Sequence, residues 1–148
     1  NGTWMFFNGD GTLKTGWGHT GTGDNKTYYH FNEKGVMETG WILVDGDWYY
    51  MSEIKDSSEG AMQRNWHLDS QDGRWYYLDP VTGKMLTGWQ KINGKWYFLS
   101  PAILAPTWMK DLDDKYHYIG GGRPYGSMYV NEYTPDGYRV GPDGAWIP

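Results

Sequence analysis

One motif recurs along most of the chain, and this repetition constrains the fold more than any other feature of the sequence. Its clearest copy runs from Gly40-Trp41 through Asp45-Gly46 and Trp48-Tyr49-Tyr50 to Gly60-Ala61-Met62. Related copies place an aromatic residue at seven corresponding positions: 4, 28, 48, 75, 96, 116 and 138. Spacings of 20 to 27 residues between these positions are typical of a solenoid, in which each unit contacts only its neighbours.

Each copy is predicted to form a β-hairpin. Asp45-Gly46 and Asn93-Gly94 favour a type I′ turn, in which both central residues need positive φ. Alternation along the second strand places Trp48 and Tyr50 on one face and Tyr49 on the other. A lone hairpin is marginally stable in water, so neighbouring hairpins must stack and share an aromatic core. The sequence therefore predicts an all-β solenoid of stacked hairpins with no substantial helix.

We expect a single module over residues 1–148, with about five clear repeats between residues 1 and 118 and degenerate repeats over 119–148. Residues 100–106, bounded by two prolines, replace a Gly-x-Met element, and residues 120–124 form a glycine-rich loop. Both are interpreted as changes in stacking geometry near the C-terminal end. The chain opens inside a repeat, which indicates a longer protein with more repeats or another domain upstream.

Composition excludes several classes of function. The 10 Trp, 13 Tyr and 4 Phe outnumber the 19 Leu, Ile and Val, so aromatic rings must supply the apolar core. A net charge of −5 disfavours nucleic acid, and no apolar run approaches the roughly 18 residues of a membrane helix. There is no cysteine, the four histidines lack metal-ligand spacing, and no hydrolase or phosphate-binding motif is present. We therefore predict no catalytic residue, no metal site and no cofactor.

The pattern Gly-Trp, Gly-x-Trp-Tyr-Tyr, Gly-x-Met resembles the choline-binding repeat, also called the cell-wall-binding repeat, over nearly the whole chain. The resemblance implies a left-handed superhelix of stacked hairpins. It also implies recognition of phosphocholine on teichoic or lipoteichoic acids by a secreted protein of the bacterial cell surface. A homodimer is compatible with such an array.

Choline is a quaternary ammonium ion that has no N–H to donate, so the receptor suited to it is a box of aromatic faces. The family takes two rings from one repeat and a third from the next. Carried over to this chain, the resemblance gives four sets: Trp41, Trp48 and Tyr77; Trp66, Trp75 and Phe98; Trp89, Trp96 and Tyr118; Trp17, Tyr28 and Tyr50. Met62 and Met85 are further candidates for cage walls, whereas Tyr49, Tyr76 and Tyr97 are expected to pack in the core.

Three alternatives to a non-catalytic wall anchor remain open. A glucan-binding module would also stack aromatic hairpins, but a sugar needs hydrogen-bonding side chains beside one flat ring. The chain is also compatible with the targeting module of a cell-wall hydrolase, whose catalytic groups would lie elsewhere. A purely structural or dimerising array with empty cages is the third.

Overall fold

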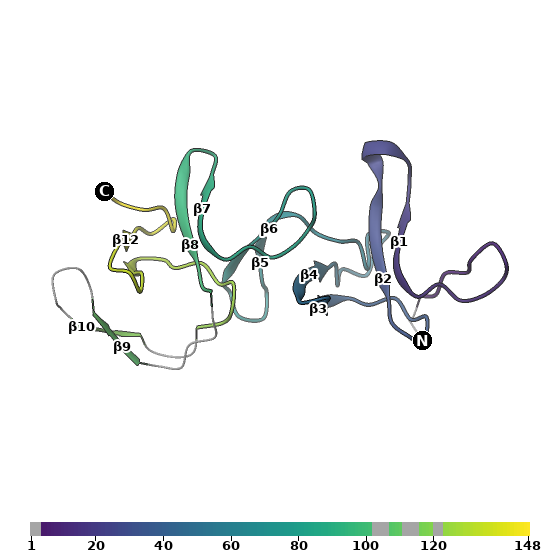
Figure 1. Ribbon diagram of the computed structural model, residues 1–148, viewed down its shortest axis with the longest axis horizontal. Helices are drawn as coiled ribbons and strands as arrows, with labels where there is room; N and C mark the ends of the chain where they lie inside the picture. The colour runs from purple at the N-terminus through teal and green to yellow at the C-terminus, as the bar shows by residue number, and fades with distance from the viewer. Residues whose placement is uncertain (1–3, 102–106, 111–115, 120–122) are drawn as a thin grey trace. The chain divides into compact units, whose positions relative to one another are not determined.

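The structure is a computed structural model that describes residues 4–101, 107–110, 116–119 and 123–148. Antiparallel two-stranded sheets make up its regular structure, and the only helical segment of the described residues is a short 3-10 turn (Figure 1). In chain order the elements are β1 Gly16–Thr20, η1 Gly23–Asn25, β2 Thr27–Phe31, β3 Gly40–Val44, β4 Asp47–Met51, β5 Asn65–Leu68, β6 Trp75–Leu78, β7 Gly88–Ile92, β8 Lys95–Leu99, β9 Thr107–Lys110, β10 Tyr116–Ile119, β11 Glu132–Tyr133 and β12 Arg139–Val140. The predicted all-β array of hairpins is confirmed.

Turn chemistry explains the tightest hairpins. Asp45 and Gly46 have φ of 50° and 86°, and Asn93 and Gly94 have φ of 50° and 83°. These values are those required by the two central residues of a type I′ turn, whose twist matches that of the flanking strands. The dipeptides therefore fix the register of β3–β4 and β7–β8, as predicted.

Each hairpin is followed by a segment that returns to its second strand. A buried residue at the end of that strand pairs with the last residue of the Gly-x-Met element. The pairs are Phe31 with Met37, Met51 with Met62, Leu78 with Met85, Leu99 with Met128, and Val140 with Trp146. The first members of these five pairs are at most 1% exposed, so this position carries the core of these repeats, whereas Phe7, which pairs with Leu13 near the start of the chain, is 69% exposed.

The C-terminal repeats differ from the prediction in one respect. Leu99 pairs with Met128, and the amide of Ser100 donates to the carbonyl of Ser127 at 2.9 Å. The Gly-x-Met element of the β7–β8 hairpin is therefore Gly126-Ser127-Met128, and it is displaced rather than replaced. The β9–β10 hairpin is an insertion between β8 and this element. Equivalent backbone hydrogen bonds connect Ser52 with Gly60 and Ala61, where a shorter insertion separates β4 from its Gly-x-Met element.

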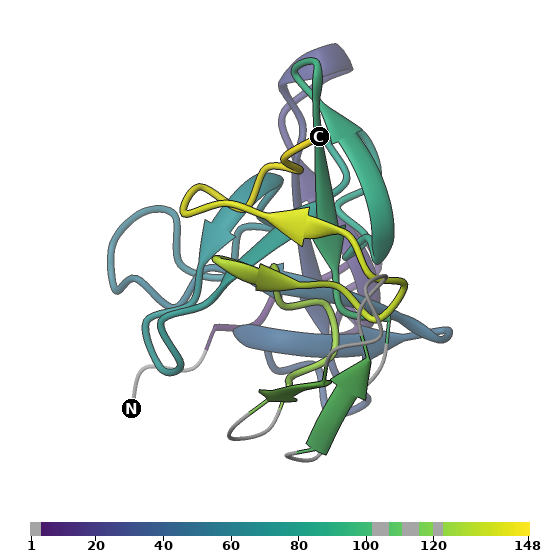
Figure 2. The ribbon, with the colours of Figure 1, turned by 90° about the vertical axis from the view of Figure 1, so that its left-hand side faces the viewer.

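The chain forms two compact units. The first comprises Asn1–Arg64 and Pro80–Lys84, and its core contains Ile42, Tyr49 and Met51. The second comprises Asn65–Asp79 and Met85–Pro148, with a core that contains Tyr77, Leu99 and Met128. In the second unit the C-terminal segment lies beside β7–β8 (Figures 1 and 2), where the amide of Trp146 donates to the carbonyl of Trp96 at 2.8 Å.

In four places a glycine that opens one of these elements packs on the methionine of the preceding element. Gly60 lies over Met37, Gly83 over Met62, Gly126 over Met85 and Gly144 over Met128, and all four glycines have φ between 77° and 86°. A Cβ on Gly83 would lie 2.6 Å from the sulfur of Met62, which is far inside van der Waals contact. The backbone conformation favours glycine at these positions, and a Cβ would also have to displace the end of the methionine side chain.

We expect Gly83→Ala to lower the free energy of unfolding by about 2 kcal/mol, because left-handed backbone strain adds to displacement of Met62. Gly46→Ala is the matched control, since φ of Gly46 is 86° and no described atom lies within 4 Å of the new Cβ. It should cost only the strain, about 1 kcal/mol. Urea denaturation of both variants measures the difference, and equal losses would contradict the packing argument.

Candidate functional site: aromatic boxes between stacked hairpins

In the four hairpins β1–β2, β3–β4, β5–β6 and β7–β8, the first strand carries a tryptophan that packs against a ring directly across the same hairpin. The centroid distances are 4.9 Å for Trp17–His30, 5.2 Å for Trp41–Tyr50, 4.9 Å for Trp66–Tyr77 and 5.1 Å for Trp89–Phe98. In every case the two residues are register partners in the ladder. The last ring of each Trp-Tyr-Tyr-type triplet therefore supports the tryptophan of its own hairpin.

In the first unit, residues of the β1–β2 and β3–β4 hairpins line a cavity of about 270 Å³, which we call the N-terminal cage. Its rings are Trp17, Tyr28 and Tyr49, and Met62 forms a further wall. Trp17 and Tyr49 meet edge to face at 4.9 Å and 73°. The amide of Met62 donates to the carbonyl of Tyr28 at 2.9 Å, so the backbone ladder brings this methionine to the cage.

Burial raises the pKa of Tyr49, whose hydroxyl therefore stays protonated at physiological pH. Lys84 opposes this shift, while Asp47 and Asp45 add to it. The ring presents a neutral π face to the cavity.

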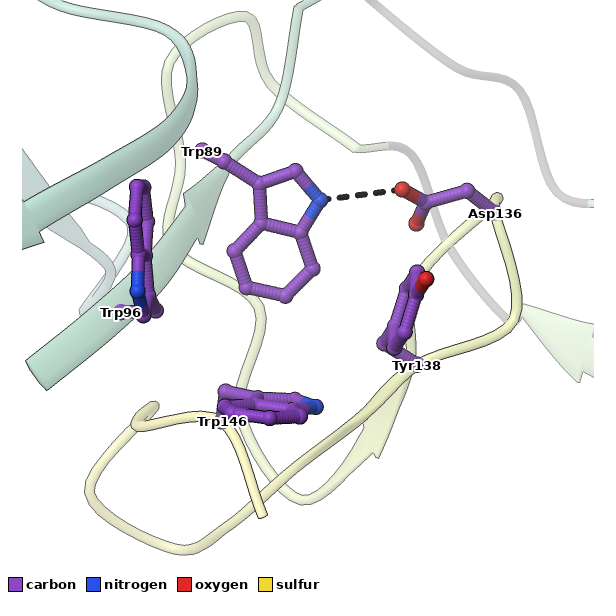
Figure 3. Close-up of a pocket in the computed structure, with 5 residues that line it drawn as sticks. All are labelled: Trp89, Trp96, Asp136, Tyr138 and Trp146. Atoms are coloured by element: carbon purple, nitrogen blue, oxygen red, sulfur yellow. Dashed lines mark hydrogen bonds between the residues drawn. The ribbon is translucent and has the colours of Figure 1, made fainter. Parts of the chain in front are cut away.

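A second cavity of about 480 Å³ lies in the second unit, and we call it the C-terminal box. Trp89 and Trp96 come from the β7–β8 hairpin, whereas Tyr138 and Trp146 come from the C-terminal segment. Figure 3 shows the four rings around a common space, with Asp136 on the side of Trp89 and Tyr138. Trp89 and Tyr138 are nearly perpendicular at 5.8 Å, and the indole Nε1 of Trp89 donates to Asp136 Oδ2 at 2.9 Å.

A third group of rings lies between β5–β6 and β7–β8. Trp66 and Trp75 stand at right angles with centroids 6.3 Å apart, and Tyr97 of the next hairpin meets Trp66 at 5.0 Å. Trp75 is 40% exposed, whereas Phe98 is buried against Trp89 and Tyr129. The structure thus joins the predicted pair Trp66 and Trp75 with Tyr97 rather than with Phe98.

In all three groups of rings, the ring from the next hairpin takes the same position along its strand. That position is one residue away from the one expected from the sequence. Tyr49 stands beside Trp17 where Tyr50 was expected, and Tyr97 stands beside Trp66 where Phe98 was expected. The reason is alternation along a strand: Tyr49 and Tyr50 point to opposite faces. The Tyr50 face packs onto Trp41 of its own hairpin, so only Tyr49 can reach back to the preceding one.

The remaining candidates stay predictions. Trp41 and Trp48 belong to the first unit and Tyr77 to the second. The side chain of Tyr118 lies outside the described residues. Met85 packs over Gly126 in the second unit.

Sequence reasoning did not identify Tyr138, Trp146 and Asp136 as site residues. Because Val140 holds the place of Met51, Gly137 and not Tyr138 occupies the position of Trp48, and Tyr138 that of Tyr49. Counting back from the buried residue would have found this register. Trp146 takes the place of a cage methionine, a signal visible in Gly144-Ala145-Trp146.

These boxes have the chemistry of a cation receptor. Ring faces carry negative quadrupole density, and several faces around one space attract a cation whose surface is apolar. Among the described residues no group of three or more His, Asp or Glu side chains could hold a metal ion. In that same part of the chain, no helix has the length and apolarity that a membrane-spanning segment requires.

Two family models match the chain. One, described as a choline-binding repeat, matches residues 102–146. The other, described as a cell wall binding repeat, matches residues 15–37, 39–53 and 87–101. No curated protein sequence matches the chain.

Solved structures with the same fold come from choline-binding proteins. Choline binding protein F from Streptococcus pneumoniae is 30% identical with a TM-score of 0.57, covering 100% of this chain and 55% of that one. CbpF in complex with ipratropium gives 28% identity, a TM-score of 0.59 and coverages of 100% and 57%. CbpJ from Streptococcus pneumoniae gives 25% identity, a TM-score of 0.54 and coverages of 98% and 76%. The present chain therefore spans little more than half the length of the CbpF structures.

Proposed function

Because this chain belongs to the choline-binding repeat family of cell-wall-binding proteins, we propose that it binds choline groups in its aromatic boxes and thereby anchors a protein to a bacterial cell wall. The observation that carries the proposal is the convergence of rings from consecutive hairpins on a common cavity, in the N-terminal cage and again in the C-terminal box. The proposed role is that of a non-catalytic module at the outer surface of the cell.

The geometry sets the expected strength of binding. Each aromatic face contributes about 0.5–2 kcal/mol to a cation, so three faces give about 2–6 kcal/mol. That range corresponds to dissociation constants near the millimolar level, where 1 mM equals about −4.1 kcal/mol. One such site is weak, but several sites on one array gain from effective concentration on a polymer that carries many choline groups.

Charge favours a local mode of recognition. The chain carries a net charge of −5, so the anionic backbone of a teichoic or lipoteichoic acid repels it overall. Attraction must therefore come from the cationic head group inside an aromatic box. Strong retention on the wall at moderate salt, with release by free choline, is the behaviour this arrangement predicts.

We expect titration of the full chain with choline to give weak, saturable binding at two or more sites. Isothermal calorimetry measures the affinity, and ¹⁵N-labelled indole signals of Trp17 and Trp89 report on the N-terminal cage and the C-terminal box separately. A glucan oligomer at the same concentration is the control ligand and should leave both signals unchanged. Shifts caused by the glucan and not by choline would favour a carbohydrate-binding module instead.

A further inference from the structure

The C-terminal box contains a carboxylate, that of Asp136, in addition to its aromatic rings. Asp136 Oδ2 accepts a hydrogen bond from the indole of Trp89 at 2.9 Å, and Oδ1 accepts one from the hydroxyl of Thr134 at 2.5 Å. Thr134 is 1% exposed, and its hydroxyl oxygen also accepts from the amide of Tyr138 at 3.1 Å. One short turn therefore holds both the carboxylate and the third ring of the box.

The carboxylate keeps free acceptor capacity toward the cavity. Each oxygen of an ionised carboxylate has two lone pairs, and each is engaged once here. Asp136 is exposed and lines the cavity, on the side of Trp89 and Tyr138 (Figure 3). A ligand in the box can thus meet four ring faces and one hydrogen-bond acceptor that carries a negative charge.

The lining of the N-terminal cage differs from that of the C-terminal box in its charged groups. Its lining consists of Trp17, Tyr28, Tyr49, Met62 and the exposed residues Val81 and Thr82, without a carboxylate among these described residues. The guanidinium of Arg64 lies over the ring of Tyr28, 5.9 Å from its centroid. A positive charge thus stands over one of this cage's own rings.

Resting on the proposed function, we propose that Asp136 is a specificity-determining residue, which makes the C-terminal box accept protonated tertiary amines at least as well as quaternary ammonium ions. A quaternary nitrogen has no N–H and gains from Asp136 only through charge. A protonated tertiary amine carries one N–H that can donate to the carboxylate, and such charge-assisted bonds are about twice as strong as neutral ones.

For a tertiary amine in the C-terminal box, the affinity gained from the hydrogen bond to Asp136 exceeds the affinity lost with one methyl group. Removing one buried methyl group weakens binding about fourfold. A hydrogen bond to a charged partner strengthens it by about tenfold or more. In the N-terminal cage a tertiary amine loses one methyl contact and gains no hydrogen bond to a carboxylate. This cage should therefore prefer choline.

Choline and N,N-dimethylaminoethanol form the matched ligand pair, since they differ by one methyl group and the second is protonated at pH 7. The full chain is titrated with each, and the indole Nε1–H signals of Trp89 and Trp17 are followed. At the C-terminal box we expect the tertiary amine to bind as tightly as choline or more tightly. At the N-terminal cage we expect it to bind about fourfold more weakly.

Asp136→Asn tests the residue itself, because asparagine keeps an acceptor for the indole of Trp89 but removes the charge. We expect affinity for the tertiary amine to fall about tenfold at the C-terminal box, and affinity for choline about twofold. Asp136→Glu retains the charge and should retain the preference. Neither variant should alter binding at Trp17, which also reports that the chain is folded.

The outcomes separate this inference from the proposed function. Equal losses for both ligands in Asp136→Asn, or an unchanged preference, would overturn the role of Asp136 while choline binding stands. A wild-type chain that binds choline at neither box would overturn the proposed function.

Discussion

Trp96→Ala is expected to lower the affinity of the C-terminal box for choline by tenfold to a hundredfold, while leaving the N-terminal cage unaffected. The variant removes one face of about 0.5–2 kcal/mol together with the apolar contact between the indole and the methyl groups. Trp96 is 41% exposed, so its loss should lower stability only modestly. Its carbonyl, which accepts from the amide of Trp146, is retained in the variant.

Two comparisons make the result specific. Trp96→Phe keeps an aromatic face and should retain most of the affinity. The indole signal of Trp17 should respond to choline equally in all three proteins, because the N-terminal cage lies in the other unit. If the Trp89 signal of Trp96→Ala responded to choline with wild-type affinity, Trp96 would not be a wall of the binding site.

The fold could be predicted because its determinants are local. Asp45-Gly46 and Asn93-Gly94 encode the turns, and apolar residues at the ends of the second strands, such as Met51 and Leu99, are buried in the core. The place of the β9–β10 hairpin could not be read from the same pattern. It resembles another repeat, and only the long-range pairing of Leu99 with Met128 shows that it is inserted within one.

The candidate site was only partly predictable, for a related reason. The resemblance to the choline-binding repeat implied Trp17, Tyr28, Trp89 and Trp96, and these four residues line the two cavities. The ring from the next hairpin depends on which face of a strand turns toward its neighbour. That choice is made by stacking between repeats, which a single repeat does not encode.

Asp136, the charged residue that lines the C-terminal box, could not be predicted from the sequence for a different reason. Asp136 stands in a turn whose sequence, Pro135-Asp136-Gly137, has an ordinary structural explanation. Its place at the box follows only from the structure, in which Thr134 and Trp89 hold its two carboxylate oxygens beside the rings. A turn residue is thus held at the lining of the cavity through a contact that spans 47 residues of sequence.

Tyr49→Leu should weaken choline binding at the N-terminal cage, whereas Tyr50→Leu should leave it nearly unchanged. The pair of variants therefore tests the register of the array directly. Tyr49 lines the cage and meets Trp17 at 4.9 Å, so its loss should weaken choline binding there by at least tenfold. Tyr50 packs on Trp41 and donates its hydroxyl to Glu53 at 2.7 Å, so its loss should leave that affinity within about twofold. Because Tyr49 is also 8% exposed and part of the core, a thermal melt accompanies each titration, and leucine is chosen to keep apolar volume. Folded proteins in which Tyr50→Leu, and not Tyr49→Leu, loses the Trp17 response would show that the third ring comes from the other face of the strand.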